Sequence, residues 1–145
     1  MTNELFEFEI LKASRTRLLQ LIETVDNNIL FKIPESFNNN IVWQIGHCIT
    51  SQHRHMYMRS GLPMHISQDF METFKIGTAP HTWKNTPDLD EIKHLLLYTV
   101  NQLSKDLESG ILLNTNHSAY QLASPSIITS KHFKRLTFTK PSTAE

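Results

Sequence analysis

Apolar residues recur at intervals of three and four positions in three long stretches, residues 3–25, 40–61 and 86–110. This spacing is typical of the buried face of an amphipathic helix. No stretch shows the alternation of apolar and polar residues that a half-buried strand requires. The sequence therefore predicts an all-α fold with three long helices. Three apolar faces favour a fourth helix to cover them, so we expect an antiparallel four-helix bundle.

Turn and capping residues mark the boundaries of the second predicted helix. Residues 26–40 contain a proline and five asparagines, which predicts an irregular loop. Asn40 is suited to accept a hydrogen bond from a free N–H group of the first helical turn. Gly61 is expected to end the helix in a left-handed conformation, and Pro63 prevents its continuation.

The third long helix has the clearest predicted start. Thr86 supplies a capping hydroxyl, Pro87 fits the first helical position, and Asp88 places an acid in the first turn. Gly110 is expected to end this helix. A short helix is also predicted at residues 67–74, between the second and third long helices.

The distribution of acidic residues changes after Gly110. Thirteen of the fourteen Asp and Glu residues lie before this glycine, and the last is Glu145. A fourth helix is predicted from Ser130 for about three turns, which is too short to cover partners about twice its length. We therefore expect a single domain, 1–145, with a shortened or incomplete fourth helix and an atypical tail at 110–145.

Composition and charge exclude several classes of protein. Fourteen Lys and Arg balance fourteen Asp and Glu, so the chain lacks the positive charge of a nucleic-acid-binding protein or a polybasic membrane patch. No apolar run approaches the roughly 18 residues of a membrane span. The single cysteine, Cys48, cannot form an internal disulfide, and residues 1–10 lack the basic and apolar regions of a secretion signal. We therefore expect a cytoplasmic protein.

Three segments resemble motifs of a known family. The run from Ile33 to His47 is similar to the start of the second helix in the DinB-like superfamily, and its most specific part is Trp-Gln-Ile-Gly-His at 43–47. Ser-Gly-Leu-Pro at 60–63 and Phe-Lys-Ile-Gly-Thr-Ala-Pro at 74–80 are similar to segments of small DinB-like proteins. The resemblance extends from residue 3 to about residue 138.

The resemblance implies a four-helix bundle, often a homodimer, that holds a divalent metal such as Zn, Ni or Fe between three histidines. His47 matches the first of these ligands. The other two normally lie four residues apart on the last helix, where side chains at i and i+4 share one face. Three protein ligands leave a position for water or substrate, so the resemblance implies a metal-dependent hydrolase or transferase of a small molecule.

The C-terminal segment departs from this pattern. His132 is the only histidine after His117, and no histidine follows it at i+4. It is a candidate for a displaced ligand, although it points about 100° away from the apolar line through Phe133 and Leu136. If one base were restored after the Phe138 codon, the following codons could be read as His-Glu-Ala-Leu-His-Ser-Gly, which is the motif that the family implies. We therefore hypothesise that the chain is the frameshifted and truncated product of a DinB-like gene.

The other histidines lack the spacing of metal ligands. His55 is expected at the surface, and His53, on a different helical face from His47, is expected to be solvated or at an interface. The remaining four are expected to lie in loops or on polar faces: His65, His81, His94 and His117. Cys48 adjoins His47, but neighbouring helical residues diverge by about 100°, so the two cannot form a catalytic pair. We expect Cys48 to be a buried, unreactive thiol.

Two classes of function follow from these observations. In the first, the chain is a metal-dependent hydrolase or transferase of unknown substrate with His47 as the remaining ligand. Because a single imidazole holds a divalent ion poorly, we expect weak or no metal binding. In the second, the chain is a non-catalytic helical module that binds a partner or dimerises through apolar faces left uncovered by a short fourth helix. A non-functional truncated product is a third alternative.

Overall fold

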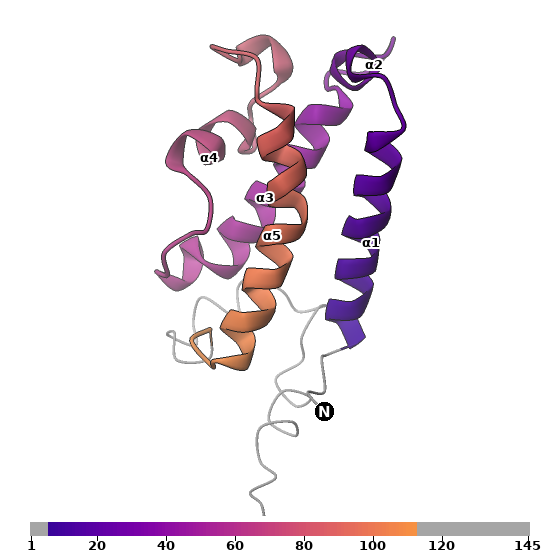
Figure 1. The fold of residues 1–145 in the computed structure, drawn as a ribbon. Coiled ribbons are helices and arrows are strands. Elements are labelled where there is room, and N and C mark those ends of the chain that lie inside the picture. Colours follow the sequence, from indigo (N-terminus) through magenta and orange to yellow (C-terminus); the bar gives the residue numbers. More distant parts are fainter. Residues whose placement is uncertain (1–5, 113–145) are drawn as a thin grey trace, which may run out of the picture.

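The computed structural model of the protein describes residues 6–112 (Figure 1). Three long helices form its body: α1 (Phe6–Glu23), α3 (Ile41–Met56) and α5 (Leu89–Glu108). Two short helices, α2 (Asn27–Phe31) and α4 (Gln68–Phe74), lie in the connections. Two single 3-10 turns follow α3 and α4, at Met58–Ser60 and Pro80–Thr82. Residues 6–112 contain no strand, which confirms the all-α prediction.

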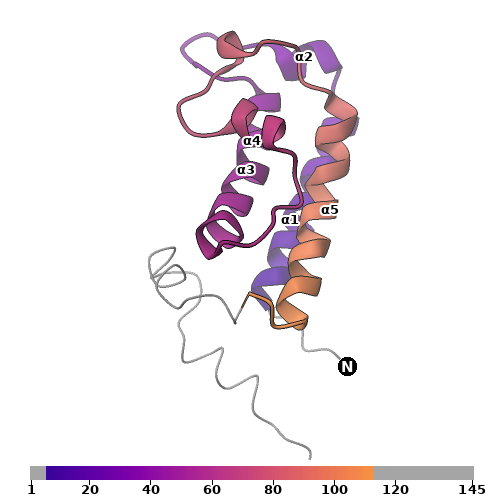
Figure 2. The same cartoon turned by 90° about the vertical axis from the view of Figure 1, so that its left-hand side faces the viewer.

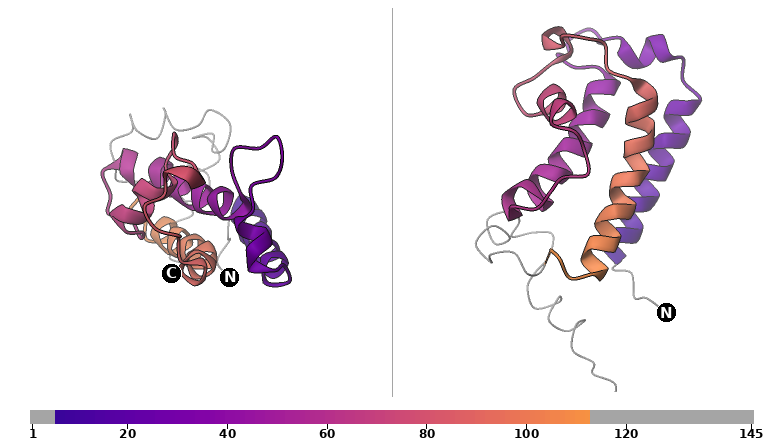
Figure 3. Two further views of the ribbon diagram at one scale, coloured as in Figure 1. Left: turned by 90° about the horizontal axis from the view of Figure 1, so that it is seen from above. Right: turned by 60° about the vertical axis from the view of Figure 1, so that its left-hand side comes forward.

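Helix α5 packs against both α1 and α3. Figures 1 and 2 show that α1 runs antiparallel to α3 and α5, whereas α3 and α5 run in the same direction. The simple antiparallel order expected from the sequence is therefore wrong for this pair. Parallel helices need a long connection, and residues 57–88 supply it as a crossover that contains α4. Figure 3 shows α4 on the side of α3 away from α1, in contact with α3.

The predicted start of α3 is confirmed by its capping contacts, whereas its predicted end is wrong, because the helix ends at Met56 and Gly61 caps the following 3-10 turn. The side-chain oxygen of Asn40 accepts a hydrogen bond from the backbone N–H of Trp43 at 2.8 Å. Its amide nitrogen donates to the carbonyl of Phe31 at 2.9 Å, so one buried side chain joins α2 to the start of α3. Gly61 has φ of 69°, the left-handed conformation that suits glycine. The predicted short helix α4 likewise begins after a capping serine, Ser67.

Two further boundaries differ from the sequence prediction. Residues 27–31 form helix α2 inside the expected loop, because the Asp26 carboxylate accepts from the N–H of Asn28 and caps a single helical turn. The N-cap of α5 is Asp88 and not Thr86. The Asp88 carboxylate accepts from the backbone N–H of Asp90 and Glu91. A carboxylate there also interacts favourably with the helix dipole, which explains why the helix begins two residues later than predicted.

The core lies where the inner faces of α3 and α5 meet. The apolar residues that recur at helical spacing within 86–110 form a stripe along α5: Leu89, Ile92, Leu96, Val100 and Leu103 are buried, and Leu107 is half-buried. Leu95 and Thr99 are buried as well, which the sequence analysis did not predict. The buried face of α5 is wider than expected because this helix contacts a neighbour on each side.

Several predictions concern residues that the structure does not describe. The fourth helix from Ser130, the ligand candidate His132 and the frameshift at Phe138 all lie outside residues 6–112, as does His117. Among the helices of the described range, none is both long enough and apolar enough to cross a membrane.

Candidate functional site

The imidazole of His47 is held by a hydrogen bond to the end of α4. Its Nδ1 atom lies 2.8 Å from the carbonyl oxygen of Phe74, the last residue of that helix. A carbonyl oxygen can only accept, so Nδ1 must carry a proton and donate it. In a neutral imidazole the other nitrogen, Nε2, then has a free lone pair.

The environment of Nε2 agrees with this tautomer. The hydroxyl of Ser51, one turn further along α3, lies 3.3 Å from Nε2 and can donate its hydrogen to the lone pair. His47 is half-buried, so the ring is neither sealed in the core nor fully in solvent. A metal-binding histidine commonly donates its second ring N–H to a backbone carbonyl in this way, which fixes the tautomer and the direction of the free nitrogen.

Trp43 fixes the plane of the imidazole. The two rings are stacked, with centroids 4.6 Å apart and planes inclined by 9°. The indole N–H of Trp43 donates to the hydroxyl of Thr78 at 3.0 Å, so the tryptophan is itself anchored to the segment after α4. The Trp-Gln-Ile-Gly-His segment therefore places two stacked rings on one side of α3.

Gly46 allows α4 to approach closely enough to reach His47. A Cβ atom at position 46 would lie 2.3 Å from Cδ1 of the Phe74 ring, closer than two carbon atoms can approach. The buried Phe74 ring thus occupies the space that any larger residue would fill. The same phenylalanine supplies the carbonyl that accepts from His47. The glycine that precedes the histidine therefore makes the contact between α3 and α4 possible.

Thr50 adds a second donor to the same carbonyl. Its hydroxyl lies 3.1 Å from the Phe74 oxygen and 3.0 Å from the His47 oxygen. Thr50 is buried, and its side chain stands between the two backbone segments that meet at the site. With His47 Nδ1 and Thr50 Oγ1 both directed at it, the Phe74 oxygen can use both of its lone pairs.

Two sequence predictions about α3 are wrong. Cys48 is exposed, although a buried thiol was expected, because its side chain points away from the packed faces of the helix. His53 is 0% exposed, although a solvated or interface position was expected. Its place in line with Ile45 and Ile49 was a signal of burial in the sequence. His55 is exposed, as predicted.

Sequence analysis missed a polar cluster at the other end of α3. Asp106 on α5 accepts hydrogen bonds at one carboxylate oxygen from the Tyr57 hydroxyl and from His65 Nε2, both at 2.7 Å. Burial and the hydrogen bond to Asp106 raise the pKa of Tyr57. His65 also contacts the rings of Tyr57, Tyr98 and His53. The cluster ties the segment after α3 to the last turns of α5.

The described residues supply one metal-ligand candidate at the site. His47 Nε2 has the lone pair and the supporting hydrogen bond of a ligand, which fits the chemistry of a divalent metal. In residues 6–112, however, no three His, Cys, Asp or Glu side chains are grouped to hold one ion together. The described residues therefore supply one metal ligand and not a complete metal centre.

The chain is thus a helical-bundle protein in which a Gly-His pair on one long helix contacts a neighbouring short helix. The chain belongs to the DinB superfamily, whose family model matches residues 10–125. The resemblance of the chain to this superfamily is thereby confirmed. No curated protein and no solved structure matches the chain.

Proposed function

We propose that this chain is by descent a metal-dependent hydrolase or transferase of DinB type, that its remaining metal-ligating atom is His47 Nε2, and that it binds divalent metal weakly. The observation that carries the proposal is the hydrogen bond from His47 Nδ1 to the Phe74 carbonyl, which leaves Nε2 as the nitrogen with a free lone pair. A bound metal would polarise a small substrate or activate a water molecule.

The residues around His47 have separable roles in this proposal. The Phe74 carbonyl accepts the hydrogen bond from Nδ1–H, and Trp43 keeps the ring plane fixed. Ser51 donates to Nε2 in the metal-free protein and would lose that contact when the lone pair binds an ion. The low affinity follows from the number of ligands, since one imidazole replaces the three that a catalytic zinc site usually has.

The proposal is tested by metal content and metal titration of the full chain. After dialysis we expect far less than one zinc or nickel ion per chain, and then weak saturable binding of added Zn²⁺ by calorimetry. The His47→Ala variant should lose this binding, whereas His81→Ala, which removes an exposed histidine, should retain it. Near-stoichiometric metal after dialysis would contradict the weak affinity. Equal Zn²⁺ binding by the two variants would contradict the assignment of His47.

A second candidate function, self-association, is favoured by one face of α1. Phe6, Ile10 and Leu21 are exposed by 74%, 51% and 56% respectively, and their spacing places them on the same side of the helix. An exposed apolar face of this kind suits an interface with a second copy of the chain. Light scattering should show a dimer that Ile10→Glu converts to a monomer. Ile76→Glu, at an exposed position outside α1, should leave the dimer intact. A wild-type chain that stays monomeric at high concentration would contradict this candidate.

A further inference from the structure

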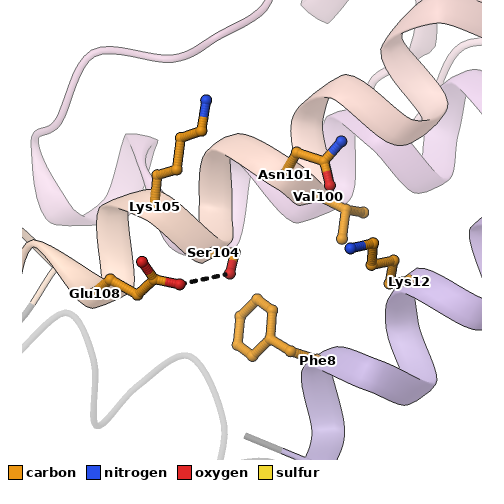
Figure 4. Close-up of a pocket in the computed structure, with 7 residues that line it drawn as sticks. All are labelled: Phe8, Lys12, Val100, Asn101, Ser104, Lys105 and Glu108. Carbon is orange, nitrogen blue, oxygen red and sulfur yellow. Dashed lines mark hydrogen bonds between the residues drawn. The ribbon is translucent and has the colours of Figure 1, made fainter. Parts of the chain in front are cut away.

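A pocket of about 380 Å³ lies between α1 and α5, away from His47. Figure 4 shows the side chains that line it, which come from the first turns of α1 and the last turns of α5. Its lining residues are Phe8, Lys12, Val100, Asn101, Ser104, Lys105 and Glu108. None of these residues contacts His47, Trp43 or Phe74 in the interactions described above, so the pocket is separate from the candidate metal site.

The pocket has an apolar wall. Val100 is 2% exposed and belongs to the core stripe of α5, while Phe8 of α1 is half-buried. Figure 4 shows the Phe8 ring and the Val100 side chain in the space between the two helices. An aromatic ring and a branched aliphatic side chain form a surface suited to the apolar part of a small molecule.

A cationic group lies beside this wall. Lys12 is exposed, and in Figure 4 its side chain extends from α1 toward Val100 and Asn101 on α5. Lys12 forms no ion pair with any residue of the described range. Asn101 also lines the pocket, and in Figure 4 its amide oxygen is directed toward Val100 while its amide nitrogen points away from the Lys12 ammonium group.

The acidic residue of the pocket does not neutralise Lys12. Glu108 lies at the far end of the lining and accepts a hydrogen bond from the Ser104 hydroxyl at 3.4 Å, as Figure 4 shows. Two lysines and one glutamate line the pocket, so its formal charge is positive. An apolar wall beside an unpaired ammonium group is complementary to a molecule with an apolar body and one negative charge.

We propose that this pocket binds a small organic carboxylate. The apolar body would lie against Phe8 and Val100, and the carboxylate would accept a hydrogen bond from Lys12 Nζ. The volume lies near the lower limit of ligand pockets, which favours a molecule of the size of a single substituted ring. This site is independent of the metal and of the function proposed for His47.

The proposal is tested by titrating the full chain with benzoate at low ionic strength and following the amide signals of α1 and α5 by NMR. We expect saturable shifts with a dissociation constant in the millimolar range, centred on residues that line the pocket. Benzamide, which has the same ring without the charge, should bind roughly tenfold more weakly, as should acetate, which has the charge without the ring.

Matched variants separate specific binding from general attraction to charge. Lys12→Gln should weaken benzoate binding by about tenfold, because it removes the ammonium group at the pocket. Lys84→Gln makes the same change in net charge at an exposed position outside the pocket and should leave the affinity unchanged. The proposal is overturned if benzoate gives no saturable shifts, if benzamide binds as tightly as benzoate, or if the two lysine variants weaken binding equally.

Discussion

His47 Nδ1 lies 2.8 Å from the carbonyl oxygen of Phe74, and this contact joins the middle of α3 to the last residue of α4. The short helix is therefore part of the candidate site and not only a connection between long helices. Its carbonyl determines which nitrogen of His47 is protonated, and so which nitrogen is free to bind a metal.

Gly46→Ala should destabilise the protein and disturb the site together. The added Cβ would overlap the buried Phe74 ring, and overpacking of this kind typically costs about 1–3 kcal/mol. Urea unfolding measures the loss, and the imidazole signals of His47 should shift because the Phe74 carbonyl must move. Cys48→Ala, at an exposed position two residues away, should change stability by less than about 0.5 kcal/mol. Equal stability of the two variants would contradict the role of Gly46.

Arg15→Met should leave stability unchanged or raise it by about 1 kcal/mol. Arg15 is 7% exposed and, within residues 6–112, donates only to the Cys48 carbonyl and the Gln52 side chain, at 3.3 and 3.4 Å. Its Nη1 atom is buried without a hydrogen-bond partner among the described residues, and burial lowers the pKa of the guanidinium. Removing a buried charge that lacks an anionic partner removes a desolvation penalty. Arg17→Met at an exposed position of α1 is the control. A loss of more than about 2 kcal/mol by Arg15→Met would show that the guanidinium is paired.

His53 should make the protein less stable at acidic pH. Burial lowers the pKa of His53 below that of an unfolded chain, which is about 6.5. As the pH falls below that value the unfolded state binds the proton first, so the stability present at neutral pH is progressively lost. Urea unfolding at pH 7.5 and pH 5.5 should show this decrease. The decrease in stability between the two pH values should be smaller in His53→Leu than in the wild type. In His81→Leu, which alters an exposed histidine, the decrease should equal that of the wild type. The same decrease in both variants would contradict the assignment.

Asp106→Ala should destabilise the junction between α3 and α5 by about 1–3 kcal/mol, because it leaves the buried Tyr57 hydroxyl without its acceptor. In a Tyr57→Phe background the same substitution should cost less, since the hydroxyl is already absent. A double-mutant cycle from thermal or urea unfolding measures this coupling. Strictly additive effects would mean that the Tyr57 hydrogen bond contributes nothing to stability.

Local sequence signals predicted much of the fold. Asn40, Gly61 and Gly110 act through contacts or φ angles within a few residues of themselves, so the sequence was sufficient to identify them. Two residues that can cap a helix, Thr86 and Asp88, lie close together before α5. The structure has Asp88 as the N-cap, and its carboxylate is a stronger hydrogen-bond acceptor than the Thr86 hydroxyl.

The environment of individual side chains was harder to predict because it depends on which helices become neighbours. The burial of His53 follows from the packing of α3 against α5, and the exposure of Cys48 follows from the face that this packing leaves open. His47 was identified from its motif, but its hydrogen-bond acceptor was not. A backbone carbonyl such as that of Phe74 has no sequence signature, and only Gly46 could have indicated a close approach at this point.

The most direct test of the account is the protonation of His47 during a zinc titration, followed by long-range ¹H–¹⁵N NMR of the imidazole. We predict that the metal-free protein carries the proton on Nδ1, and that added Zn²⁺ shifts the Nε2 signal of His47 while Nδ1 stays protonated. A proton on Nε2 in the metal-free protein, or zinc shifts that appear first at other histidines, would contradict the claim that the Phe74 carbonyl prepares His47 to bind a metal.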